Sequence, residues 1–404
     1  MFENFTFDQK FILLKIYSFI DNLFFPMSIW LLFFNNFVST SELAFILAIT
    51  YFFEVVLEVP SGVLADKVGK KTTVVLALIL YGIGMLGHLY VTSFYTALLV
   101  RLLTATSGSL KSGADEALIY EYFEENGQVD KYKQKYSVMQ FYGQLGTALS
   151  TITGGFIYAF SIYLPYLIVF INHLFLISIV LLLFTEQKIK RSEENVISLK
   201  LKISTFFQQN KEGLSNLLKS QFLRVMPVFF IMSFLLYIRN GLLGYSQFEM
   251  FGYNTSEQLS VLLFTSFLLS AMIFRLIHQK LNVDSINKVY ILMLILLFSY
   301  IISGFNIFYW GIILVILRDV ISLLFENYRS DLMNRYIDSS NRATILSFYV
   351  LIRKLIYSIF TFFIGFLVVS YNANQILMYL GTAGLLIMIV YILLTKKNIW
   401  SKQK

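Results

Sequence analysis

The chain has 404 residues, of which 57% are hydrophobic and only 14% are charged. Soluble domains carry about 25% charged residues, so this composition excludes an ordinary water-soluble protein and predicts one whose main solvent is lipid. The net charge is +8 and cysteine is absent, which excludes disulfides, thiolate zinc sites and iron–sulfur clusters. Three histidines lie far apart in the sequence, so we expect no metal site and no cofactor: His88, His173 and His278.

Apolar runs divide the chain into predicted membrane spans, since a bilayer core takes roughly 20 apolar residues per helix. They cover residues 11–33, 42–63, 73–91, 94–116, 136–159, 163–184, 223–245, 256–277, 288–305, 308–328, 343–369 and 373–395. The longest connection, 185–222, is polar and separates six runs from six. We therefore predict an all-α membrane protein with twelve transmembrane helices in two six-helix bundles, 1–184 and 223–404, joined by a cytoplasmic loop. Segments 121–135 and 186–202 are interpreted as solvated polar stretches.

Lysine and arginine predict the orientation of these spans, because cytoplasmic loops carry an excess of both. Of the 32 positive charges, 27 fall in loops or near the ends of spans on one side of the predicted membrane, the two terminal segments included. The other five lie deeper inside spans: Arg101, Arg239, Arg318, Arg353 and Lys354. The opposite loops, near 34–41, 92–93, 160–162, 246–255, 306–307 and 370–372, contain none. Both termini are therefore predicted to be cytoplasmic, and the basic balance requires no nucleic-acid partner.

A faint internal repeat relates the two halves. Ser137 precedes Gly155 by 18 residues in the fifth span, and Ser347 precedes Gly365 by 18 in the eleventh. With six spans on each side of the central loop, this spacing suggests duplicated halves, an arrangement found among secondary transporters. In such folds the substrate site lies near the midplane between the halves.

The loop after the second span reads Glu-Val-Pro-Ser-Gly-Val-Leu-Ala-Asp-Lys-Val-Gly-Lys-Lys over residues 58–71. Gly62 would permit close helix approach or a tight exit, and Gly69 a turn with positive φ. By composition alone, an ordinary positively charged cytoplasmic loop is an equally good interpretation. The residues that carry the motif are Glu58, Gly62, Asp66, Gly69, Lys70 and Lys71.

This spacing at the cytoplasmic exit of the second span closely resembles the signature loop of the major facilitator superfamily. The resemblance implies a charge network that latches the outward-open state, made here by Asp66, Lys70 and either Asp115 or Glu116. It also implies a gating role for Glu58. Lys70 stands where arginine is commoner, which loses bidentate geometry.

Two further family motifs are incomplete. Arg101 is present in the fourth span without the Gln-Gly that follows it in the family. Gly154 and Gly155 are similar to the end of the antiporter motif, whose proline is missing here. The resemblance to bacterial drug/proton antiporters implies proton-coupled efflux of hydrophobic or amphipathic small molecules by alternating access.

Charged residues inside spans are the candidate sites of coupling and substrate binding, because each costs about 2.5–3.5 kcal/mol at the bilayer centre on insertion scales. The candidates are Asp21, Glu54, Arg101, Arg318, Asp319 and Arg353.

In the functional interpretation, Asp21 and Glu54 bind protons, Arg101 modulates them, and Arg318 or Arg353 meets an anionic substrate. In the alternative interpretation, opposite charges pair as structural or gating bridges. The predicted bridges are Asp21 or Glu54 with Arg101, and Asp319 or Glu326 with Arg353.

We therefore expect a secondary transporter and no enzyme, since no ATP-binding loop and no cluster of catalytic side chains is visible. Its partners would be a small-molecule substrate, protons and the bilayer, and we expect a monomer in a bacterial cytoplasmic membrane. Uptake of an anionic nutrient and lipid flipping remain alternatives.

Overall fold

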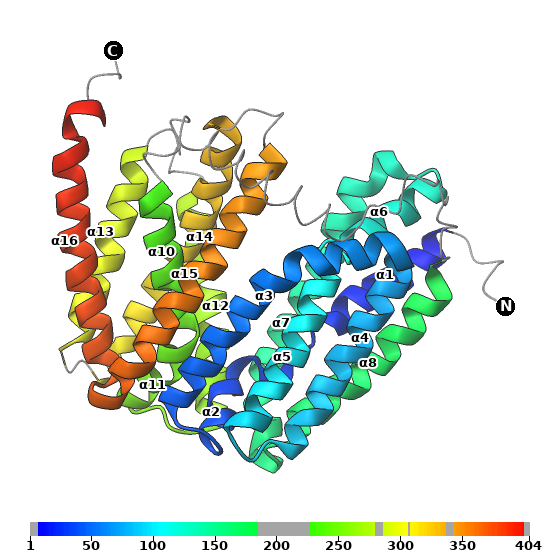
Figure 1. Ribbon diagram of the computed structural model, residues 1–404, viewed down its shortest axis with the longest axis horizontal. Coiled ribbons are helices and arrows are strands. Elements are labelled where there is room, and N and C mark those ends of the chain that lie inside the picture. Colours follow the sequence, from blue (N-terminus) through cyan, green and yellow to red (C-terminus); the bar gives the residue numbers. More distant parts are fainter. Residues whose placement is uncertain (1–6, 185–225, 279–285, 306–307, 337–341, 400–404) are drawn as a thin grey trace. The chain divides into compact units, whose positions relative to one another are not determined.

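The computed structural model of the chain describes residues 7–184, 226–278, 286–305, 308–336 and 342–399 (Figure 1). Within these ranges the elements are helices. The predicted central loop, 185–222, lies outside them. Contacts divide the chain into two compact units. The first is Met1–Gln208 with Thr255–Phe264, and the second is Gln209–Asn254 with Thr265–Lys404.

The first unit is built from long helices joined by short breaks. Pro26 lies in the 3-10 turn that interrupts the first predicted span, and Gly69 alone separates α3 from α4. In order, its elements are α1 (Phe7–Asp21), η1 (Phe25–Ser28), α2 (Trp30–Asn35), α3 (Thr40–Val68), α4 (Lys70–Gly87), η2 (His88–Tyr90), α5 (Phe94–Lys111), α6 (Ala114–Glu125), η3 (Val129–Lys131), α7 (Tyr132–Phe160) and α8 (Leu164–Leu183).

The second unit contains one bent helix pair. The segments Met226–Ile238 and Leu242–Met250 meet at 55°, with Gly241 as the N-cap of the second. Its elements are α10 (Met226–Asn240), α11 (Leu242–Met250), α12 (Ser256–His278), α13 (Ile286–Ser303), η6 (Phe308–Trp310), α14 (Gly311–Tyr336), α15 (Arg342–Ser370) and α16 (Ala373–Ile399). The first residues of α12 belong to the first unit by their contacts.

Each predicted span is overlapped by a helix, but not every helix has the character of a span. In the described part of the chain, eight helices are long and apolar enough to cross a membrane, and nine if the bent pair is one span. The helices α5 and α7 are not among them, and the described apolar part of α13, Lys288–Ser303, is short. The all-helical membrane fold is confirmed, whereas the count of twelve and the cytoplasmic termini remain predictions.

The internal repeat has a counterpart in helix lengths. The helices α7 and α15 each contain 29 residues, and both their first and their last residues are 210 positions apart. Ser137 and Gly155 are related to Ser347 and Gly365 by the same offset. The spacing in the sequence therefore coincides with two matching helices.

The prediction that 121–135 is a solvated stretch holds for most of its residues, which are exposed, but it is wrong for one face of α6. The segment is mostly helical, and Tyr122 and Phe123 are buried in the core of the first unit beside Leu118 and Ile119. The ring of Phe7 lies 5.4 Å from that of Phe123. The helix α6 carries its apolar residues at positions i, i+1, i+4 and i+5, which places them on one face. Its acidic residues make the average composition of the segment polar, so the buried face was not predicted.

Candidate functional site

The signature loop begins inside a helix. Because α3 continues to Val68, Gly62 lies in its interior, and a Cβ added there would meet nothing within 4 Å. The prediction of a close approach or a tight exit at Gly62 is therefore wrong. The prediction for Gly69 is confirmed, since its φ is +91°. Its carbonyl accepts a hydrogen bond from the Thr73 hydroxyl at 2.7 Å, which orders the first turn of α4.

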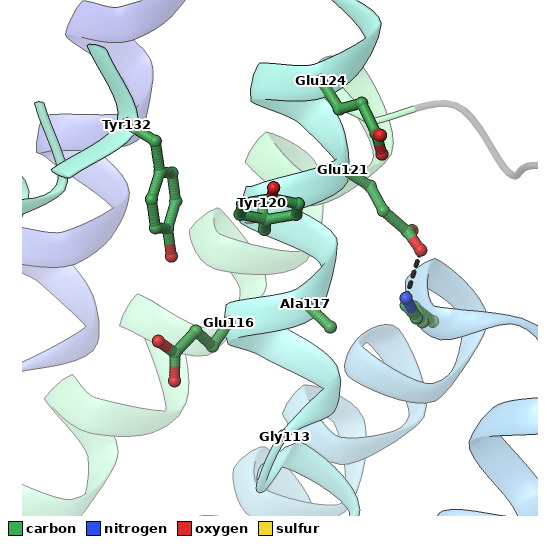
Figure 2. Close-up of a pocket in the computed structure, with 8 residues that line it drawn as sticks. Gly113, Glu116, Ala117, Tyr120, Glu121, Glu124 and Tyr132 are labelled. Atoms are coloured by element: carbon green, nitrogen blue, oxygen red, sulfur yellow. Dashed lines mark hydrogen bonds and ion pairs between the residues drawn. The ribbon is translucent and has the colours of Figure 1, made fainter. Parts of the chain in front are cut away.

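Lys70 forms its ion pair with Glu121 on α6, and not with the predicted Asp115 or Glu116. Figure 2 shows Glu116 and Glu121 on opposite sides of α6. Both line a cavity of about 530 Å³ together with Tyr120. The neighbouring Lys71 donates to the Leu181 carbonyl of α8 at 3.3 Å. The loop is thus connected to two other helices of the first unit. Of the two acidic residues of the motif, Glu58 is partly buried and Asp66 is exposed.

Asp21 lies in a polar group that we call the Asp21 cluster, which consists of Tyr17, Asp21, Lys111 and Asp115. Lys111, the last residue of α5, forms an ion pair with Asp21, the last residue of α1. The Tyr17 hydroxyl donates to Asp115 Oδ1 at 2.6 Å. Lys111 lies 5.7 Å from the centroid of the Tyr17 ring, and both carboxylates attract it electrostatically.

The charges of the Asp21 cluster do not cancel, because two carboxylates share one ammonium. In a medium of low polarity an excess negative charge is unfavourable. One proton added to either carboxylate would neutralise the cluster. The sequence indicated Asp21 but paired it with Arg101. Lys111 was missed because it was counted as a loop cation, although it falls inside the predicted span 94–116.

Arg101 has no hydrogen bond through its Nε, which is buried, and the ion pairs between described residues do not include it. It acts electrostatically on Tyr51 and Tyr81. Glu54 is partly buried on α3. The predicted bridge from Asp21 to Arg101 is replaced by the bridge to Lys111.

Arg318 is completely buried in the second unit. Its Nη1 donates to Gln247 Oε1 and its Nε to Ser299 Oγ, both at 2.9 Å, and its guanidinium lies 4.4 Å from the Tyr300 ring centroid. Asp319 accepts a hydrogen bond from the Ser266 hydroxyl. This arrangement connects α11, α13 and α14 through neutral groups, and it favours the structural interpretation of Arg318 over substrate contact.

Arg353 lies on α15 and is partly exposed. Its guanidinium is 5.9 Å from the ring centroids of both Tyr349 and Tyr357. Glu326, one of its predicted partners, pairs instead with Arg329. The side chain of Arg239, the remaining arginine predicted inside a span, is not described.

Gly154 and Gly155 are positions of very close packing. A Cβ on Gly154 would lie 2.2 Å from the Phe25 carbonyl oxygen, and one on Gly155 would lie 1.9 Å from that of Ser256. The Gly155 N–H also donates to Ser260 Oγ at 2.6 Å. These segments all belong to the first unit, so the glycine pair lets α7 approach both η1 and the start of α12.

The helical fold, the charged groups within its spans and the loop at Gly69 together define a multi-pass membrane transporter. The chain matches the Major Facilitator Superfamily over residues 11–360, and it therefore belongs to that superfamily. No curated protein matches the sequence.

Solved structures of known transporters share this fold. The nucleoside transporter NupG has a TM-score of 0.70 and 13% identity, covering 96% of this chain and 99% of that one. The POT family transporter PepTSo has a TM-score of 0.69 and 11% identity, with coverages of 97% and 98%. A bacterial homolog of the human lysosomal transporter Spinster has a TM-score of 0.64 and 13% identity, with both coverages at 98%.

Proposed function

We propose that the protein is a proton-coupled secondary transporter that exports hydrophobic or amphipathic small molecules. The observation that carries the coupling is the Asp21 cluster, where two carboxylates share one lysine between α1, α5 and α6. A partly buried carboxylate with a second carboxylate nearby is a natural proton-binding group.

Protonation would act through the contacts of α1. With Asp21 ionised, its ion pair with Lys111 joins the end of α1 to the end of α5. A proton on Asp21 removes that attraction and leaves Lys111 to Asp115, which the Tyr17 hydroxyl already contacts. The proton thereby changes which helices are joined, and a ligand shifts a conformational equilibrium only through such differential contacts.

Export is supported by the glycine pair on α7, which is similar to the end of the antiporter motif and packs closely against η1 and the start of α12. Uptake of an anionic nutrient is the second candidate, because Arg101 carries a charge within the membrane and its buried Nε lacks a hydrogen-bond partner among the described residues. The neighbours transport nucleosides or peptides by their names, but identities of 11–13% do not select a substrate.

The test is flux in proteoliposomes under an imposed pH gradient. A thermal-shift screen of amphipathic dyes on purified protein first selects the probe, because ligand binding stabilises the folded state. We expect proton-driven dye flux in the wild type, its loss in Asp21→Asn, and its retention in the control Asp130→Asn, an exposed residue of η3. Full activity of Asp21→Asn would refute the coupling role, and the gradient direction that drives accumulation distinguishes export from uptake.

A further inference from the structure

Two facing rows of side chains on α10 and α15 form what we call the aromatic ladder: Phe230, Ser233 and Tyr237 with Tyr349, Arg353 and Tyr357. Phe230 stacks on Tyr349 with centroids 5.0 Å apart and planes at 17°. Tyr237 stacks on Tyr357 at 4.0 Å and 12°. Residues spaced by four lie on one helix face, so Arg353 projects between the two ring pairs.

The tyrosines of α15 are held in place by one residue of α10. The Tyr349 hydroxyl and Ser233 Oγ are 2.9 Å apart, and the Tyr357 hydroxyl donates to the Ser233 carbonyl at 3.0 Å. Both rings are buried, whereas Tyr237 and Arg353 are partly exposed. The rings of Tyr349 and Tyr357 are therefore buried and held by hydrogen bonds, and the Tyr237 ring and the Arg353 guanidinium form the accessible part of the ladder.

The charge of Arg353 is not balanced within the ladder. The ion pairs between described residues do not include Arg353, and its buried Nε has no hydrogen-bond partner among them. Glu326, an acid that acts electrostatically on Tyr349, is paired with Arg329, which itself lies 5.2 Å from the Tyr349 ring centroid. The ladder thus carries a net positive charge.

A partly exposed guanidinium in the interior of a 29-residue helix of the membrane domain is costly against lipid. Such residues therefore face the protein interior or water. Guanidinium is a planar fork of donors that matches a carboxylate in a bidentate manner. The flanking rings favour a flat apolar group, which they contact by offset or edge-to-face packing.

We propose that the aromatic ladder binds the carboxylate of a planar aromatic acid, with Arg353 as the anion-binding group and Tyr237 as the ring platform. This substrate class rests on the proposed transport function and deepens it, since an aromatic acid is an amphipathic molecule. It assigns recognition of the acid group to Arg353 and leaves Arg318 to its neutral partners.

Equilibrium binding to the purified full-length protein tests the site without any transport. The probes are benzoate, its uncharged analogue benzamide and the non-aromatic cyclohexanecarboxylate, each measured by calorimetry in detergent at one pH. We expect benzoate to bind the wild type roughly 10- to 100-fold more tightly than benzamide, because a hydrogen-bonded charge is lost. Cyclohexanecarboxylate should bind more weakly than benzoate because ring packing is lost.

Variants place the site on the ladder. Arg353→Gln should reduce benzoate affinity to that of benzamide, Arg353→Lys should give an intermediate affinity, and Tyr237→Leu should remove the preference for benzoate over cyclohexanecarboxylate. Arg275→Gln, at an α12 residue that makes none of these contacts, should bind benzoate as the wild type does.

Equal binding of benzoate and benzamide by the wild type, or no binding of either, would overturn the proposal without any variant. Benzoate binding that survives in a folded Arg353→Gln protein would overturn it as well. These results are independent of coupling. Benzoate binding without proton-driven flux would refute the proposed function alone, and flux without benzoate binding would refute only the aromatic-acid site.

Discussion

Lys111 is the one cation of the Asp21 cluster. Its ammonium pairs with Asp21 and is attracted by Asp115. Both members of the ion pair keep about a fifth of their side-chain surface exposed, at 23% and 20%. The pair is therefore neither a surface bridge of negligible value nor one fully removed from solvent, and its loss should be measurable.

We predict that Lys111→Met destabilises the protein by about 3 kcal/mol, the lower end of the range for breaking a buried pair. The reason is that two carboxylates would then face each other without a cation. The double variant Asp21→Asn/Lys111→Met should be more stable than Lys111→Met alone, because the uncompensated charge of Asp21 is gone. Thermal unfolding in detergent measures both, and strictly additive effects would contradict the contact.

Tyr17 tunes the Asp21 cluster through its hydroxyl, which donates to Asp115. A hydrogen bond to an ionised carboxylate favours its charged form, so Tyr17→Phe should favour protonation of the cluster. The profile of transport against pH should therefore move to higher pH, by up to about one unit. Tyr95→Phe is the control, since Tyr95 is 79% exposed. A shift to lower pH, or none, would show that the hydroxyl does not act on the proton site.

At the scale of the helix, the α7 glycines make a prediction about packing. Gly155→Ala places a Cβ 1.9 Å from a backbone oxygen of Ser256, which a side-chain rotation cannot relieve. We expect a loss of about 1–3 kcal/mol, typical of overpacking, with a lower Tm and reduced transport.

Gly108→Ala on α5 is the matched control, because a Cβ there meets nothing within 4 Å. Alanine is the better helix former by about 1 kcal/mol, so this variant should be as stable as the wild type or more stable. If both glycine variants behaved alike, helix propensity would explain the result and the close contact at Gly155 would not.

The long apolar helices could be predicted from the sequence, but the pairing of their charged side chains could not. Long apolar runs indicate where helices lie, because burial of apolar surface and internal backbone hydrogen bonding both act locally. Which charges meet depends on how the helices pack: Asp21 was assigned to Arg101 and meets Lys111, and Lys70 was assigned to Asp115 or Glu116 and meets Glu121. The predicted and observed partners differ by roughly one and a half to three helical turns, a distance that span boundaries read from composition do not resolve.

Local geometry was predictable where one residue type decides it. Gly69 adopts the positive φ expected of it. Gly62 does not form a break, since α3 continues through Pro60 to Val68. The amphipathic α6 was missed since its acidic residues and its buried Tyr122 and Phe123 alternate within one turn. The average composition of such a segment indicates solvent even when one face is buried.

At the scale of the whole molecule, the distribution of lysine and arginine indicates which side of the membrane each loop faces. The helices alone do not give this orientation. The loops predicted to face outward carry no positive charge, and the others carry 27. The positive-inside bias acts on short loops, and most of these loops are short. Inserting or removing one span would transfer whole groups of lysines to the wrong side. The charge pattern therefore supports twelve spans, whereas eight or nine helices in the described part of the chain satisfy a strict test of length and hydropathy.

The absence of cysteine makes this topology directly testable, because the wild type is a blank for thiol labelling. We predict that Ser161→Cys and Asn372→Cys react with a membrane-impermeant maleimide in right-side-out vesicles, whereas Asp130→Cys reacts only in inside-out vesicles. All three positions are exposed, so a lack of reaction reports the membrane and not burial in the protein. Labelling of Ser161→Cys and Asp130→Cys from one side would require an even number of crossings between them, and α7 would then not cross the membrane despite its 29 residues.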